Sequence, residues 1–272
     1  MRVLRLYSNT TKQDMTVSYF SSSNSGSSLV NGNKDSIYCT SAGFHSDDGR
    51  GYQIVLSSGY PLPEIGYFLS VNRGETIFRV DKIDKERILL SVSAKGFLSV
   101  SDRCSFLRPL RTGILTVSDK GSRGEREDTS GPALEELVTR LGADISEKAI
   151  LPDERDSIER ILLSWSEDSD LDLILVTGGT GLSKRDVTPE ALDAIADKQV
   201  PGLGEYMRMR TSEFTERAIL SRGKGVVRSE TLIVAFPGSI NGATQCFDAI
   251  SPVLRHGVEI IRGWTKECGH SH

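Results

Sequence analysis

Residues 177–181 read Thr-Gly-Gly-Thr-Gly, a composition typical of a loop that binds phosphate. The run follows an apolar segment at 171–176, which predicts a buried strand. Because Gly178, Gly179 and Gly181 have no Cβ, the backbone there can approach a ligand closely and adopt positive φ angles. These residues therefore predict a tight turn in which Thr177, Gly178, Gly179, Thr180 and Gly181 contact an anionic ligand.

A helix start follows this turn after a short charged loop. Thr188 is expected as the N-cap and as one of the phosphate-binding residues, with Pro189 at the first helical position and Glu190 behind it. A strand, a glycine turn and a helix N-terminus together gather backbone N–H groups around a phosphate. Within the loop, Lys184 and Arg185 either clamp the phosphate chain or are solvated surface charges.

Two aspartates near this turn are candidates for metal binding and catalysis. Asp186 lies in the charged loop, and Asp153 follows a predicted strand at 145–151. A carboxylate beside a phosphate site is electrostatically unfavourable unless it binds a cation or takes part in the chemistry. Mg²⁺ prefers one or two carboxylates together with phosphate oxygens and water. We therefore expect Asp153 and Asp186 to share Mg²⁺ in a phosphoryl or nucleotidyl transfer.

Two further predicted strands, 114–117 and 231–236, also end in polar or turn-forming residues. These residues are Ser118 and Asp119 after the first strand, and Pro237, Gly238 and Ser239 after the second. In a parallel sheet the carboxyl ends of the strands form the usual ligand-binding edge, so these residues are expected to line the same site. The alternative is that they are ordinary turn residues.

Two common nucleotide-binding motifs are absent. The chain contains no G-x-x-x-x-G-K-[ST] sequence, and no G-x-G-x-x-G follows a strand. The expected phosphate site therefore belongs to neither the P-loop class nor the dinucleotide-binding class.

The second part of the chain alternates predicted strands with helices. Helices are expected at 134–141, with Gly142 as the stop, at 158–165, from residue 188, and at 203–217. A last helix is expected from about 241 to 261, interrupted at Pro252. Strands that alternate with helices of this length predict an α/β fold with a mostly parallel sheet covered by helices on both faces.

The first part of the chain predicts a small all-β domain. Short β-rich runs occur at 3–7, 15–20, 37–40, 53–56, 67–71, 76–80, 88–92 and 97–100. Residues 72–74 are expected to form a hairpin loop and residues 21–36 a mobile loop, and no helical periodicity is visible before residue 128. We therefore divide the chain into a barrel-like β domain at 1–108 and an α/β domain at 109–272.

Composition excludes several classes of protein. The 272 residues carry a net charge of −4, divided between 14 Lys and Arg against 10 Asp and Glu in 1–112 and 19 against 27 in the remainder. No basic stretch interleaves with aromatic residues, so nucleic-acid binding is not expected. Neither a membrane span nor a secretory signal is expected, and four scattered cysteines favour reduced thiols in the cytoplasm. The tail with Cys268, His270 and His272 could bind a metal, although a frayed terminus is the simpler interpretation.

Eight ordered sequence segments between about 112 and 266 resemble the molybdopterin-binding family, and most closely its molybdopterin adenylyltransferase branch. The segments are 116–119 (TVSD), 128–131 (DTSG), 151–154 (LPDE), 177–181 (TGGTG), 185–190 (RDVTPE), 201–205 (PGLGE), 218–222 (AILSR) and 236–239 (FPGS). The resemblance implies transfer of AMP from ATP to the terminal phosphate of molybdopterin, supported by Mg²⁺.

The same resemblance assigns roles to residues. It implies that Asp153 and Asp186 are catalytic and metal-binding, and that residues 178–181 cradle phosphate. It places Ser118, Asp119 and residues 237–239 at the rim that binds pterin and nucleotide. It also implies a homotrimer, and a downstream protein that accepts the activated pterin for insertion of molybdenum.

Two alternatives to this function remain open on the sequence. The first alternative is that the chain binds molybdopterin as a carrier or sensor and does not catalyse a reaction. Residues 1–108 lie outside the resemblance, and a third hypothesis is that they carry out a consecutive step of the same pathway.

Overall fold

A computed structural model describes residues 63–71, 75–84, 87–93 and 104–264, together with the backbone of six further strands before residue 100. The chain divides into two compact units. The first comprises Met1–Pro109 with Thr139–Gly142, and the second comprises Leu110–Val138 with Ala143–His272. The tail at 265–272, for which a frayed terminus was preferred over a metal site, lies outside the described residues.

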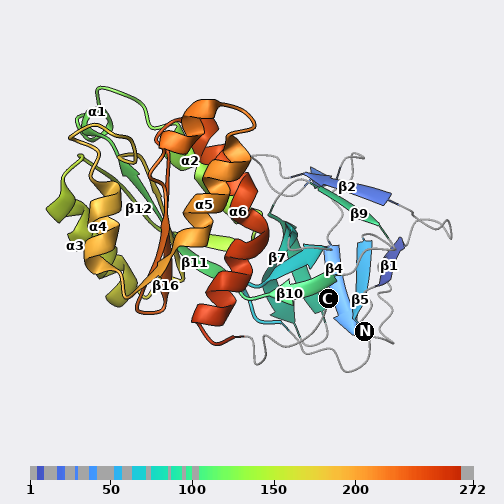
Figure 1. Cartoon of the computed structure of the whole chain (residues 1–272). Helices are drawn as coiled ribbons and strands as arrows, with labels where there is room; N and C mark the ends of the chain where they lie inside the picture. The colour runs from blue at the N-terminus through green and yellow to red at the C-terminus, as the bar shows by residue number, and fades with distance from the viewer. Residues whose placement is uncertain are drawn as a thin grey trace. The chain divides into compact units, whose positions relative to one another are not determined.

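The first unit contains two β-sheets (Figure 1). The seven-stranded sheet has the order β1-β5-β4-β8-β7-β6-β10, and the three-stranded sheet has the order β3-β2-β9. Their strands are β1 (Arg5–Ser8), β2 (Val17–Ser21), β3 (Ser28–Leu29), β4 (Ile37–Ser41), β5 (Tyr52–Leu56), β6 (Phe68–Val71), β7 (Glu75–Asp84), β8 (Arg87–Val92), β9 (Gly96–Ser99) and β10 (Cys104–Leu107). All pairs are antiparallel except β4 with β5.

The prediction of an all-β first part is confirmed, with each of the eight expected strands found within a few residues. Strands β3 and β10 are additional, and β3 falls inside the segment expected to be a mobile loop, the rest of which lies outside the described residues. Strands β6 and β7 pair antiparallel, as expected of a hairpin, although its loop at 72–74 is not described. Alternate residues of β7, including Phe78 and Val80, are buried, because successive side chains of a strand point to opposite faces.

The second unit is built on one six-stranded sheet with the order β12-β11-β13-β16-β15-β14. Its strands are β11 (Leu110–Val117), β12 (Ala143–Leu151), β13 (Leu173–Thr177), β14 (Lys198–Val200), β15 (Gly225–Arg228) and β16 (Thr231–Phe236). Strands β12, β11, β13 and β16 are parallel, whereas β15 and β14 are antiparallel additions at one edge. The predicted mostly parallel α/β fold is confirmed, and the two edge strands are the part that the sequence did not predict.

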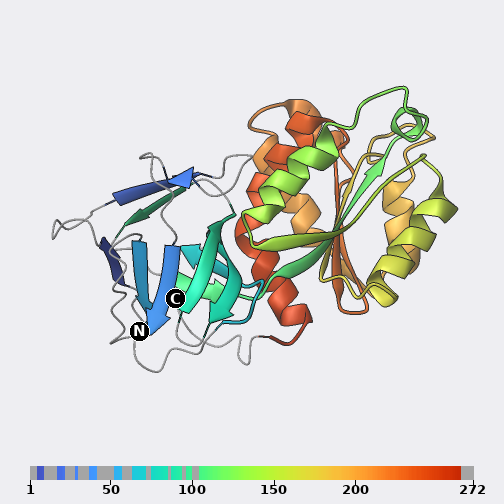
Figure 2. The same ribbon diagram turned by 180° about the vertical axis from the view of Figure 1, so that it is seen from behind.

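Helices cover both faces of this sheet (Figure 1, Figure 2). Helices α3 (Arg155–Glu167) and α4 (Thr188–Ile195) lie on one face, and α2 (Ser130–Thr139), α5 (Pro201–Thr211) and α6 (Ile240–Ile261) lie on the other. The central strand β13 is buried over its whole length, as expected of a strand covered on both sides. On the α3 and α4 face, Ile158, Leu162 and Trp165 pack with Leu192 and Val176 in one apolar core.

Two helical segments differ from what the sequence pattern indicated. A four-residue helix, α1 (Asp119–Ser122), precedes residue 128, because Ser118 caps it by accepting a hydrogen bond from the Gly121 N–H. The helix expected at 203–217 ends at Thr211 and is followed by the 3₁₀-helix η1 (Glu216–Leu220).

Helix α6 continues through Pro252, so the predicted interruption is wrong. A proline has no N–H to donate to the carbonyl four residues earlier. Here the Ser251 hydroxyl donates to the Asp248 carbonyl at 3.2 Å, which supplies a donor that Pro252 cannot. Buried Phe247 and Leu254 on either side hold the helix against the sheet.

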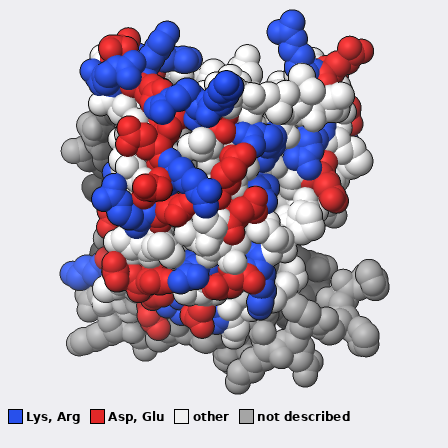
Figure 3. Space-filling model, turned by 60° about the vertical axis from the view of Figure 1, so that its left-hand side comes forward, with Lys and Arg blue, Asp and Glu red and all other residues white. Residues whose placement is uncertain are grey.

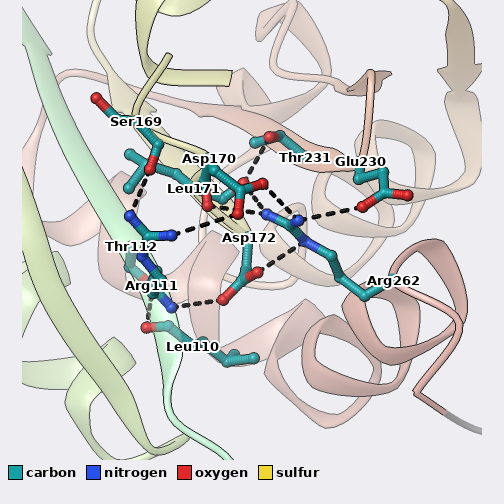
Figure 4. Close-up of polar contacts among 10 residues, drawn as sticks. All are labelled: Leu110, Arg111, Thr112, Ser169, Asp170, Leu171, Asp172, Glu230, Thr231 and Arg262. Atoms are coloured by element: carbon teal, nitrogen blue, oxygen red, sulfur yellow. Dashed lines mark hydrogen bonds and ion pairs between the residues drawn. The ribbon is translucent and has the colours of Figure 1, made fainter. Parts of the chain in front are cut away.

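An ion-pair network fixes the end of the sheet opposite the strand carboxyl ends (Figure 4). The Asp172 carboxylate lies 2.7 Å from Arg262 Nε and accepts a 2.7 Å hydrogen bond from the Arg111 N–H. Arg262 also donates to the Leu171 carbonyl at 2.9 Å and pairs with Asp170 at 2.7 Å. These contacts tie the C-terminal end of α6 to the starts of β11 and β13.

Charges of both signs are interspersed over the α3 and α4 side of the unit (Figure 3). Several are paired, including Arg155 with Glu159 and Arg228 with Glu167. This side therefore has no extended field of a single sign. None of the helices in the described residues is both long and apolar enough to cross a membrane.

Candidate active site

A cavity of about 650 Å³ opens at the carboxyl ends of the parallel strands of the second unit. Because β11, β13 and β16 are adjacent and parallel, the segments that follow them meet at one edge of the sheet. The cavity is lined by Thr116, Val117, Ser118, Gly121, Arg126, Glu127, Asp128, Thr129, Ser130, Asp153, Thr177, Gly178, Gly179, Thr180, Gly181, Leu182, Asp186, Arg217, Leu220, Ser221, Pro237, Gly238 and Ser239. Eleven predicted site residues are among them, and the structure thus brings together segments up to 121 positions apart.

The glycine turn forms the floor of this cavity. Gly178 has φ +104° and Gly179 has φ +63°, which are conformations that residues with a Cβ rarely adopt. A Cβ on Gly178 would lie 2.1 Å from the Val117 carbonyl oxygen of the neighbouring strand. The Gly178 N–H donates to the Phe236 carbonyl at 3.1 Å, so the turn is fixed to β16.

Thr188 supports the turn from behind, and the prediction that it caps α4 is wrong. Val187 is the N-cap, and Thr188 is the first helical residue. The buried Thr188 hydroxyl donates to the Gly178 carbonyl at 2.9 Å, and its N–H donates to the Gly179 carbonyl at 3.1 Å. Its hydroxyl is therefore used to hold the glycine backbone, and Thr188 does not line the cavity.

Asp119 and Asp153 form a reciprocal pair across the ends of β11 and β12. The Asp119 N–H donates to Asp153 Oδ2 at 3.0 Å, and the Asp153 N–H donates to Asp119 Oδ1 at 3.1 Å. Burial raises the pKa of the Asp153 carboxyl above its usual range, and the negative charges of Asp119 and Asp186 act in the same direction. The Asp119 pKa is lowered, chiefly by its hydrogen bonds from Arg185.

Arg185 contacts Asp119 and does not enter the cavity. Its Nε and Nη2 donate to the two carboxylate oxygens of Asp119 at 3.0 and 2.6 Å, in the bidentate geometry typical of arginine. Lys184 is exposed and likewise is not part of the cavity wall. Of the predicted loop residues, only Asp186 lines the cavity directly.

Asp186 is held by its own loop, and one of its carboxylate oxygens accepts no hydrogen bond from the described residues. Its Oδ2 accepts from the Ser183 N–H at 2.8 Å, and its own N–H donates to the Ser183 carbonyl at 3.0 Å. Gly181 lies so close that a Cβ there would be 2.9 Å from Asp186 Oδ2. The lack of a side chain at Gly181 therefore makes room for the Asp186 carboxylate.

The sequence profile described as "Probable molybdopterin binding domain" matches residues 113–256, which is more than half of the chain. The matched residues belong to the second unit, except 139–142, which belong to the first. The chain belongs to this molybdopterin-binding family. The cavity and the predicted phosphate, catalytic and magnesium residues, from Ser118 to Ser239, lie inside the matched range.

Relatives of known name support the same membership. The molybdopterin adenylyltransferase of Helicobacter pylori strain 26695 is 36% identical over 159 residues, covering 58% of this chain and 90% of that protein. The molybdopterin adenylyltransferase of Escherichia coli K12 is 39% identical over 158 residues, covering 56% and 81%.

Solved structures of similar proteins have the same α/β fold. The molybdopterin biosynthesis enzyme MoaB from Thermus thermophilus is 45% identical with a TM-score of 0.55, covering 57% of this chain and 97% of that chain. The tungsten cofactor synthesizing protein MoaB from Pyrococcus furiosus is 31% identical with a TM-score of 0.52, covering 57% and 99%.

The structure of this family member also identifies cavity residues that sequence reasoning did not select. Arg126 and Arg217 line the cavity, and their side chains make no hydrogen bond or ion pair within the described part of the chain. Asp128 accepts hydrogen bonds from the Thr116 hydroxyl at 2.6 Å and the Gly131 N–H at 2.9 Å, which fixes the start of α2. The DTSG segment was the only sequence signal that could have selected Asp128 as a site residue. No local sequence pattern identifies Arg126 or Arg217 as cavity residues.

The donor groups in the cavity fit a magnesium ion that is bound together with a substrate. Within the described residues, Asp153 Oδ1 and Asp186 Oδ1 accept no hydrogen bond, so each carboxylate presents one available oxygen. No three His, Cys, Asp or Glu side chains of those residues form a metal site of their own. Two carboxylate oxygens plus ligands from phosphate and water match the usual preference of Mg²⁺.

Proposed function

We propose that this chain is a molybdopterin adenylyltransferase, which transfers AMP from ATP to the terminal phosphate of molybdopterin and releases pyrophosphate. The observation that carries the proposal is the single cavity shared by the glycine turn and by the available oxygens of Asp153 and Asp186. Its volume of about 650 Å³ lies within the range of small-molecule sites. The two adenylyltransferases that align over most of their length support the same activity.

The reaction requires two anionic groups to approach each other. A phosphate oxygen of molybdopterin attacks the α-phosphorus of ATP, a new P–O bond forms, and the bond from that phosphorus to the bridging oxygen of pyrophosphate breaks. Catalysis of this kind depends on positioning and on neutralising charge. The turn at Gly178 and Gly179 lets backbone approach the phosphate chain without side-chain obstruction.

The charges of the cavity wall support a cation-dependent reaction. Four carboxylates, from Glu127, Asp128, Asp153 and Asp186, face only two arginines. An anionic nucleotide would be repelled by this wall unless a cation accompanied it. Mg²⁺ bound to phosphate oxygens would neutralise their charge, and Asp153 and Asp186 are the residues that would hold it.

The remaining wall residues are proposed to orient the substrates. Ser118 and Ser239 cap α1 and α6 through their side-chain oxygens, so each brings a helix start to the cavity edge. Arg126 and Arg217 are the cationic side chains available to pair with phosphate. Arg185 acts indirectly, because its bidentate contact fixes Asp119 and thereby the backbone that contacts Asp153.

We also propose that the chain assembles as a homotrimer. Large apolar side chains are exposed along α5, η1 and the segment between them, including Met209, Phe214, Ile219 and Leu220. An exposed apolar surface of this kind favours association with another protein surface. The adenylylated pterin would then pass to a downstream protein that inserts molybdenum.

The proposed function is tested with pure protein, ATP, Mg²⁺ and molybdopterin, by measuring pyrophosphate and the adenylylated pterin. We expect both products in equal amounts and only when all components are present. Pterin binding without any dependence on ATP and without pyrophosphate release would instead identify a carrier. Expressing residues 1–108 and 109–272 separately, and assaying each, tests whether the β domain contributes a second step.

A further inference from the structure

Arg222 lies beside the active-site cavity, in the segment between η1 and β15, and its contacts converge on the loop that carries Asp186. Its Nε donates to the Gly181 carbonyl at 2.8 Å, and its Nη2 donates to the Asp186 carbonyl at 2.6 Å. Its Nη1 pairs with the Glu190 carboxylate on the first turn of α4, and its backbone N–H donates to the Thr180 carbonyl at 2.9 Å. One residue thus holds both ends of the loop at 182–185.

These contacts suit an arginine and no other side chain. A guanidinium group presents up to five N–H donors in a fixed plane, whereas a lysine ammonium is a single point of charge on a flexible stem. The Gly181 and Asp186 carbonyls are bound by two different nitrogens of that plane, which fixes their separation. The backbone on either side of the Asp186 side chain therefore has a defined position.

We propose that Arg222 is a positioning residue for AMP transfer, which sets the location of the Asp186 carboxylate relative to the glycine turn. The expected effect on kcat rests on the proposed function, whereas the expected effect on the position of the loop rests on the contacts of Arg222 alone. Arg222 does not line the cavity, so it acts through Asp186 and not on the substrate.

Arg228 provides a matched control for loss of a half-buried arginine. Its side chain is 28% exposed, against 31% for Arg222, and it pairs with Glu167 and Asp197 and donates to the Ile195 carbonyl at 3.3 Å. It is six positions further along the chain, at the end of β15, and none of its partners lines the cavity. Arg228→Met should therefore lower stability without a specific loss of turnover.

The kinetic experiment compares Arg222→Met, Arg222→Lys, Asp186→Asn and the Arg222→Met/Asp186→Asn double variant. We expect Arg222→Met to lower kcat about 100-fold while changing the KM for ATP little, because misplacing a reacting group by about 1 Å has effects of that size. Arg222→Lys should recover only part of the loss. The double variant should be no slower than Asp186→Asn alone, since both changes remove the same function. The proposal would be overturned if the fold-losses in kcat of the two single variants multiplied in the double variant, or if Arg222→Met kept full activity.

Amide hydrogen exchange tests the same inference without any need for activity. Arg222→Met should accelerate exchange at Ser183 and Asp186, whose N–H groups are hydrogen-bonded within the loop, and Arg228→Met should not. Unchanged exchange at both residues in Arg222→Met would overturn the positioning role. If the wild-type chain transferred no AMP but this exchange pattern held, the proposed function would fail while the structural role of Arg222 stood.

Discussion

Replacing Gly178 with alanine should disrupt the centre of the candidate active site and the adjoining sheet. The added Cβ would lie 2.1 Å from the Val117 carbonyl oxygen, a backbone atom that belongs to β11. Strands β11 and β13 are hydrogen-bonded to each other in register up to Thr116 and Thr177, so neither can move away freely. Relief of the clash therefore requires the two central strands to separate or the turn to change conformation.

The size of the effect follows from two terms. Placing a residue with a Cβ at φ +104° costs about 1–3 kcal/mol. Forcing an extra methyl group into closely packed surroundings costs a further amount of about 1–3 kcal/mol. Together the change is about 2–6 kcal/mol, which is a large part of the roughly 5–15 kcal/mol that stabilises a typical domain.

Gly124→Ala is the matched control because it isolates the backbone term. Gly124 also has a positive φ, +70°, but a Cβ there would have no heavy atom within 4 Å among the described residues. The expected cost is about 1–2 kcal/mol. The comparison of the two variants therefore measures the clash between the turn and β11.

Urea unfolding followed by tryptophan fluorescence is the appropriate assay. Both tryptophans, Trp165 and Trp264, belong to the second unit, and Trp165 is buried in its core. We expect Gly178→Ala to unfold at a clearly lower urea concentration than Gly124→Ala and to lose AMP transfer. Equal unfolding midpoints for the two variants would refute the steric reasoning.

Three further predictions concern stability, substrate binding and assembly. Asp153→Asn should abolish AMP transfer yet raise the Tm near neutral pH. Burial raises the pKa of the Asp153 carboxyl, so the wild-type fold loses stability as pH rises through that pKa, and the gain in Tm should disappear in acid. A lower Tm of the variant at neutral pH would contradict this assignment. Changing Arg126 and Arg217 together to glutamine should raise the KM for ATP or pterin by roughly tenfold with little change in Tm, whereas unaltered KM values would exclude them from substrate binding. Phe214→Asp should convert the proposed trimer into monomers in sedimentation experiments, since the new carboxylate would be buried at the proposed interface. An unchanged sedimentation coefficient would remove the segment between α5 and η1 from that interface.

Much of the second unit follows from local sequence because its signals are local. Val-, Ile- and Leu-rich runs predicted β11, β13 and β16, since strands buried on both faces have no polar alternation to obscure them. The glycines at 178 and 179 marked the turn, because positive φ angles select glycine wherever they occur. The same reasoning failed for β14 and β15, which are short strands whose pairing is set by their neighbours in space.

Tertiary structure decided which side chains line the cavity and which support those that do. Arg185 was a candidate phosphate clamp from its position in the loop, yet its guanidinium contacts Asp119, which is 66 residues away in the sequence. Arg222 reaches Gly181 across 41 residues, and no local pattern encodes that contact. Residue type and spacing thus determined the strand ends and the turn, because these depend on the chain's own backbone preferences. The partners of each charged side chain depend on which segments the sheet brings together, and only the folded chain fixes that.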